Sequence, residues 1–84
     1  MTKAELEEKI RQNPSVSGNL RRLRDAHGFS QEKVCAALQL RGCDIGRTTY
    51  ARYESGDANV RVSVLMELKK LYACEYDEFF AALD

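Results

Sequence analysis

The feature that most constrains the fold of this chain is the spacing of its apolar residues. They recur at intervals of three and four along almost the whole sequence, and no stretch shows the alternation typical of a half-buried strand. Pro14, Gly28, Gly42 and Gly56 interrupt the pattern, and both residue types commonly end helices. The sequence therefore predicts an all-α fold built from short helices.

Capping residues and helix breakers set the expected bounds of these helices. Thr2-Lys3-Ala4-Glu5 has the form of a capping box, so a first helix should begin there and end before Pro14. Its apolar stripe, Leu6 and Ile10, is too narrow to stabilise that helix alone. The other helices are expected at 15–27 or 17–27, 31–41, 47–55, 62–72 and 76–83.

Length and composition exclude several classes of protein. The 84 residues allow one small domain. Because no run of about 18 apolar residues exists and the N-terminus has no apolar signal region, we expect a cytoplasmic protein without a membrane span. Three cysteines without a C-x-x-C pair and a lone His27 predict neither a metal site nor a disulfide framework. We find no catalytic motif, so we expect no enzyme and no cofactor.

The net charge is zero, but the charges are unevenly distributed. Residues 15–61 hold eight basic and five acidic side chains, whereas residues 62–84 hold two basic and five acidic ones. This asymmetry favours one basic face centred on the middle of the chain.

The stretch GRTTYARYESG at 46–56 predicts a helix with two unlike sides. At 100° per residue, Arg47, Ala51, Thr48 and Arg52 fall within 140° of one another, while Tyr50 and Tyr53 lie opposite. Arginine, threonine and a small apolar group are what a recognition helix needs to read base edges in the major groove. A solvated surface that happens to carry two arginines is the alternative interpretation.

The wider pattern resembles the Xre/Cro-type helix-turn-helix repressors. The segments that carry the resemblance are NLRRLRDAHGFSQEKVCAAL, RTTYARYESG and VLMELKKLYACEYDEFF, in the order that this family has them. The resemblance spans about residues 17–83. It implies a compact five-helix DNA-binding domain at 15–84, to which residues 1–14 add a short N-terminal helix.

The resemblance also implies which residues contact DNA. Gln31 opens the first motif helix, where the family meets phosphate and an outer base, and Thr49 can touch phosphate at the groove wall. The full set implied is Gln31, Arg47, Thr48, Thr49, Ala51, Arg52, Asn59 and Arg61. Arg24 and Glu54 match a structural ion pair between the helix expected to end at His27 and the end of the recognition helix.

Two departures from the family pattern leave questions open. The segment QLRGCDIG before the recognition helix is longer than usual, which can lengthen the preceding helix and move Arg41 toward DNA or solvent. Residues 1–14 are not part of the pattern, and can form a dimer contact, an arm over the core or a nearly disordered tail.

The sequence thus predicts a sequence-specific regulator that binds double-stranded DNA, with repression as the expected outcome. A protein-interaction module on the same fold, such as an antitoxin or adaptor, is the alternative. A homodimer on a palindromic operator is expected, because one recognition helix covers few base pairs. Two apolar surfaces are candidates for pairing: Leu6 with Ile10, and the terminal helix with Tyr76, Phe79, Phe80 and Leu83. Alternatively, Phe79 and Phe80 close the monomer core.

Overall fold

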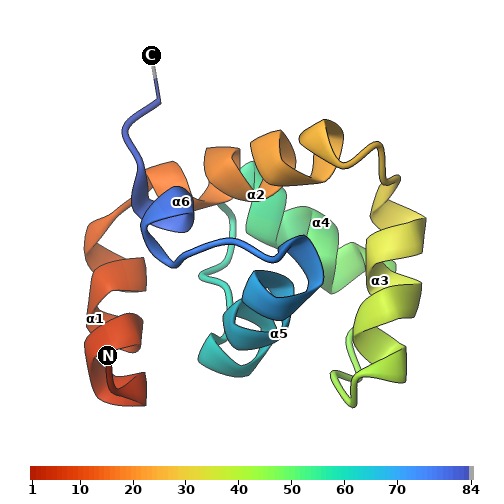
Figure 1. Ribbon diagram of the computed structural model, residues 1–84, viewed down its shortest axis with the longest axis horizontal. Coiled ribbons are helices and arrows are strands. Elements are labelled where there is room, and N and C mark those ends of the chain that lie inside the picture. The colour runs from red at the N-terminus through yellow and green to blue at the C-terminus, as the bar shows by residue number, and fades with distance from the viewer. Residues whose placement is uncertain (84) are drawn as a thin grey trace.

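The computed structural model describes residues 1–83, and these residues form helices and loops without any strand. Figure 1 shows the helices wrapped around a common centre, with α2 across one side and α5 packed beneath it. The all-α prediction is confirmed. The helices are α1 (Lys3–Gln12), α2 (Ser15–Ala26), α3 (Gln31–Leu40), α4 (Arg47–Ser55), α5 (Val62–Tyr72) and α6 (Asp77–Phe80).

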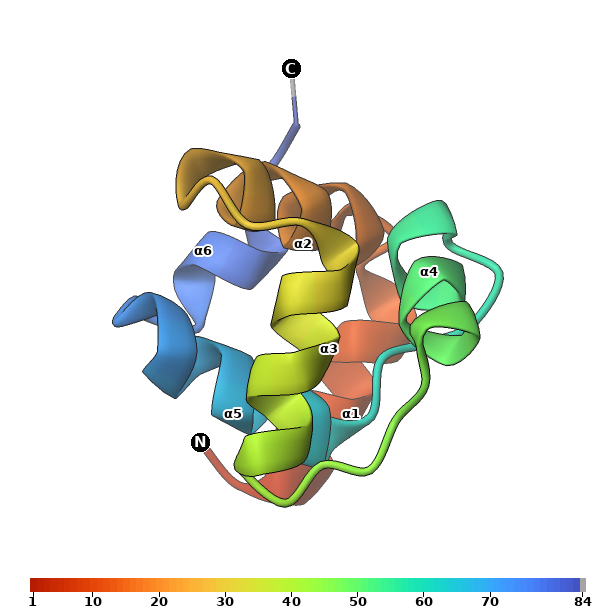
Figure 2. The same ribbon diagram turned by 90° about the vertical axis from the view of Figure 1, so that its right-hand side faces the viewer.

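One core joins all six helices. Tyr50, Leu65 and Phe79 are among its fully buried members, and they come from α4, α5 and α6. α2 packs against α4 and α6, while α3 packs against α4 and α5. This arrangement fixes α4 from its inner side and leaves its outer side at one edge of the molecule, as Figure 2 shows. None of the helices in the described part of the chain is long and apolar enough to span a membrane.

The N-terminal helix α1 belongs to this core. The predicted capping box is present, with Thr2 accepting from the Glu5 backbone N–H and Glu5 accepting from that of Thr2. Leu6 and Ile10 are 1% and 5% exposed, and α1 lies against α5. Of the three roles considered for residues 1–14, the structure shows the arm over the core. The proposal that Leu6 and Ile10 form a pairing surface is therefore wrong, since both are already covered within the monomer.

The long connection between α3 and α4 is an ordered turn. α3 ends at Leu40, and Gly42 takes the left-handed conformation, with φ of 89°, that a glycine adopts readily. Ile45 is buried, and its carbonyl oxygen accepts a hydrogen bond from the Gln39 side chain at 3.1 Å. Arg41 points toward α5, where its Nη1 lies 3.7 Å from the Glu67 carboxylate. Arg41 remains exposed, so of the two places considered for it the structure shows the solvent-exposed surface, beside Glu67.

The C-terminal helix is shorter than its apolar pattern predicts. α6 ends at Phe80, and from Ala81 the backbone is extended, so the helix expected at 76–83 is wrong beyond Phe80. At this end Asn19 of α2, a fully buried residue, donates from Nδ2 to the Phe79 and Ala81 carbonyl oxygens at 3.0 and 2.8 Å. A helix continuing to residue 83 would use the Phe79 carbonyl itself, so the bond from Asn19 competes with that continuation, and the bond to Ala81 satisfies a carbonyl that such a helix would leave unpaired. Phe79 closes the monomer core, the second of the two roles considered for it.

Candidate nucleic-acid interface

The two-sided helix expected at 47–55 is present as α4. Gly46 precedes it in extended conformation, and Gly56 ends it with φ of 85°, a left-handed geometry that glycine tolerates. Tyr50 and Tyr53 are buried, and their rings meet edge to face with centroids 6.4 Å apart. These two side chains anchor the helix by one face. The opposite face is therefore held at a fixed angle to the domain.

The outer face of α4 lines a shallow depression with the start of α3. Gln31 reaches this depression from α3, and Arg47 and Arg52 border it from α4. Of the residues that the resemblance implies, Thr49, Asn59 and Arg61 lie outside it. The lining residues are Gln31, Arg47, Thr48, Ala51, Arg52, Ser55 and Asp57.

Ser55 and Asp57 are the members of this depression that the sequence did not reveal. The Ser55 hydroxyl donates to the Asp57 carboxylate at 2.9 Å, so the two close the end of the depression where α4 stops. An acidic residue gave no reason to expect a place beside DNA, because phosphates repel it. Its hydrogen bond from Ser55 holds it in this position.

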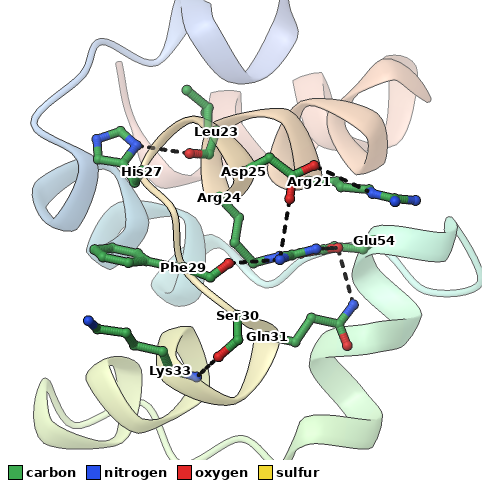
Figure 3. Close-up of polar contacts among 10 residues, drawn as sticks. All are labelled: Arg21, Leu23, Arg24, Asp25, His27, Phe29, Ser30, Gln31, Lys33 and Glu54. Carbon is green, nitrogen blue, oxygen red and sulfur yellow. Dashed lines mark hydrogen bonds and ion pairs between the residues drawn. The ribbon is translucent and has the colours of Figure 1, made fainter.

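A largely buried ion pair ties the end of α4 to α2, as Figure 3 shows. Arg24 donates to Glu54 twice, from Nε to Oε2 at 2.7 Å and from Nη2 to Oε1 at 3.0 Å. The two side chains are only 12% and 5% exposed. Arg24 Nη1 also donates to the Phe29 carbonyl oxygen at 2.8 Å, and Gln31 Nε2 donates to Glu54 Oε1 at 3.2 Å. One carboxylate thus holds α2, α3 and α4 together.

The environment of this pair keeps both partners ionised. Burial raises the pKa of the Glu54 carboxyl group, but the hydrogen bonds from Arg24 and Gln31 outweigh that effect, and the net pKa is lowered. The hydrogen bonds to Glu54 also raise the pKa of the Arg24 guanidinium. Such mutual stabilisation makes the loss of either partner costly.

Two tyrosine hydroxyls lie close to the ion pair. The hydroxyl groups of Tyr50 and Tyr72 are buried, and neither has a hydrogen-bond partner of normal geometry within residues 1–83. Burial raises the pKa of Tyr72 to about 12, and it raises the pKa of Tyr50 as well. Both side chains are therefore neutral at physiological pH and serve as packing groups.

Asn59 and Arg61 lie in the connection between α4 and α5, and both are exposed. They line a second groove, whose other wall is α1 with Lys3 and Arg11. The sequence did not predict that α1 would form a wall of this groove, because no local signal indicates where an added helix packs. No group of three or more His, Cys, Asp or Glu side chains suited to a metal ion occurs among the described residues.

α3, the turn after it and α4, whose outer face is exposed, have the arrangement of a helix-turn-helix. The family model described as Helix-turn-helix matches residues 20–79, well over half of the sequence. The chain belongs to this family of DNA-binding proteins, and its Xre/Cro-type arrangement is the one that the sequence pattern predicted. No curated protein and no solved structure gives a significant match to the chain.

Proposed function

We propose that this protein is a transcriptional regulator that represses by occupying a specific operator, with α4 in the major groove. The observation that carries the proposal is the exposed set of Arg47, Thr48 and Arg52 on a helix whose opposite face is buried. Arginine pairs with the O6 and N7 atoms of guanine through two hydrogen bonds, and threonine hydroxyls bond to several base edges. Ala51 between them suits contact with a thymine methyl group.

The segments on either side of α4 carry polar and basic side chains suited to phosphate, which supports this assignment of α4. Gln31 at the start of α3 lies on one side of the recognition helix, and Asn59 and Arg61 follow its other end. Phosphate contacts of this kind set the register of a protein on the duplex, while base contacts set its sequence preference. We propose that Asn59 and Arg61 contact phosphate, that Gln31 contacts phosphate and an outer base, and that Thr49 is a further phosphate contact at the groove wall.

We further propose that two copies bind a palindrome. A single recognition helix covers too few base pairs for high specificity, so proteins of this type place two helices about 34 Å apart on one face of the duplex. With Leu6, Ile10 and Phe79 buried, what remains of the two candidate pairing surfaces is the C-terminal segment, where Leu83 is 47% exposed and Phe80 is half-buried. Sedimentation of Leu83→Asp beside the wild type, with and without DNA, tests whether this surface pairs.

In vitro selection of DNA from a random library tests the regulator directly. We expect enrichment of a palindrome, and Arg47→Ala or Arg52→Ala should each weaken binding to it by about 1 to 3 kcal/mol and relax one base position. Lys70→Ala is the matched control, because Lys70 is an exposed cation on α5 that lines neither groove. Equal losses on selected and random DNA would mean that these arginines touch phosphate only. Failure to enrich any DNA, with tight capture of a protein partner, would favour the interaction module.

A further inference from the structure

The N-terminal helix α1 places positive charge beside the connection that leaves the recognition helix. α1 lies outside the matched family region of residues 20–79, so the family pattern assigns it no function. Its side chains Lys3 and Arg11 form one wall of the groove whose other wall contains Asn59 and Arg61. Three cations thus surround this groove, against one carboxylate, that of Glu7.

The cations of the groove are available to an anionic ligand. Lys3 and Arg61 form no ion pair with any other residue of 1–83. Arg11 is paired with Glu8 one turn earlier on α1, but the two side chains are 59% and 51% exposed. An exposed pair at this spacing contributes only a few tenths of a kcal/mol, so a phosphate can displace Glu8 at little cost.

The groove is continuous with the end of the recognition helix. Arg11 and Asn59 line it and also line the neighbouring hollow that extends to Gly56, the residue at which α4 ends. Figure 2 shows the connection leaving α4 at the edge of the molecule and then turning inward toward α1 and α5. A DNA strand that follows the major-groove wall past the end of α4 therefore comes next to Arg11.

We propose that Arg11, assisted by Lys3 and Arg61, binds a backbone phosphate of the duplex beyond the base pairs that α4 reads. This inference rests on the proposed function, since it adds a contact to the same complex. It gives α1 a second role besides covering the core. The contact is indifferent to base sequence, so it should strengthen binding to selected and random DNA by the same factor.

The salt dependence of binding by the full chain tests the contact. Each neutralised phosphate contributes a slope of about −0.9 to the plot of log affinity against log salt concentration. Between 50 and 200 mM salt, the wild type should therefore lose about 3.5-fold more affinity than Arg11→Gln, while Arg11→Lys should retain the wild-type slope. Lys70→Gln is a close control, because Lys70 also pairs with a glutamate one turn earlier on its own helix and is 62% exposed.

A second variant gives a change in the opposite direction, which unfolding cannot mimic. Glu8→Gln frees Arg11 and should tighten binding by about 1.4-fold to fivefold, the equivalent of an exposed ion pair. The gain should vanish in Glu8→Gln combined with Arg11→Gln, since it requires the arginine. A gain that persists in the double variant would show plain repulsion between Glu8 and DNA, and would overturn the proposal.

Two other outcomes separate this proposal from the proposed function. In the first outcome, the wild type binds DNA and Arg47→Ala loses specificity, but Arg11→Gln has the same salt dependence as Lys70→Gln. This result would refute the α1 contact and leave the proposed regulator function intact. If the wild type selects no DNA at all, the proposed function itself fails. Thermal melting of each variant identifies any loss of binding that comes from unfolding.

Discussion

The ion pair between Arg24 and Glu54 should dominate the stability of the domain. The Glu54 side chain is only 5% exposed, so removing Arg24, as in Arg24→Met, leaves a buried carboxylate with the Gln31 amide as its remaining donor. Breaking a buried pair from one side typically costs about 3 to 5 kcal/mol. Native domains are stable by only about 5 to 15 kcal/mol, so this single change removes a large part of the total.

The opposite change, Glu54→Gln, should be milder. Arg24 then keeps its hydrogen bond to the Phe29 carbonyl oxygen at 2.8 Å and its ion pair with Asp25 at 3.5 Å, and it is more exposed than Glu54. The loss is then that of charge-assisted hydrogen bonds, about 1.5 to 3 kcal/mol. We therefore expect Arg24→Met to be less stable than Glu54→Gln, and both to be less stable than the wild type.

Urea unfolding followed by circular dichroism at pH 7 measures both changes, and thermal melting gives an independent check. For a domain of this size, 3 kcal/mol lowers the melting temperature by about 12 °C or more. Variants that both remain within 1 kcal/mol of the wild type would refute the reasoning, as would a reversed order of the two. A normal melting temperature for Arg24→Met together with lost DNA binding would instead make Arg24 a DNA contact.

Three further predictions concern the groups around the core. The pKa of Glu54 is lowered from its ordinary value of 4.5, so its contribution to stability is present above pH 4.5 and is lost as the pH falls through the folded-state pKa. In Glu54→Gln, the free energy of unfolding measured with urea should therefore fall less steeply as the pH is lowered. The pKa of Tyr72 is raised to about 12 from 10.0, so the contribution of this side chain to the free energy of unfolding is lost as the pH rises through this range. Tyr72→Phe should remove the part of the alkaline destabilisation that Tyr72 causes, without lowering the melting temperature at pH 7. A lower melting temperature at pH 7 would reveal a hydrogen bond to the hydroxyl. Asn19→Ala should cost about 1 to 3 kcal/mol in urea unfolding, because the Phe79 and Ala81 carbonyl oxygens lose their donor, and an unchanged midpoint would show that these oxygens find another.

The recognition helix was predictable from sequence because its signals are local. Tyr50 and Tyr53 mark the buried face at helical spacing, and Gly56 marks the end through the left-handed conformation that it adopts. The ion pair is different, since Arg24 and Glu54 lie 30 residues apart and nothing in their neighbourhoods indicates contact. A resemblance to a known family supplied that pairing, and the periodicity of the apolar residues did not.

The errors arose where a distant residue decides the local conformation. Residues 76–83 have a helical apolar pattern, yet the helix stops at Phe80, where Asn19, some sixty residues earlier, donates to the Phe79 and Ala81 carbonyl oxygens. The sequence predicts that Leu6 and Ile10 form an apolar stripe on one helix. The length and spacing of that stripe do not show whether it packs on the core of its own chain or on a second copy of the protein. α5 supplies the covering surface, which only the folded chain brings into reach.

Gln31 links the stability of the domain to the way it can read DNA. A carboxylate only accepts hydrogen bonds, so the contact with Glu54 fixes the Gln31 amide with its nitrogen toward the ion pair. Its second N–H and its carbonyl oxygen are left for the depression that Arg47 and Arg52 border. An amide held in this way can offer one donor and one acceptor to an adenine edge, or its donor alone to a phosphate, without first being ordered. The ion pair that holds α2 to α4 therefore also prepares the outermost contact of the proposed complex.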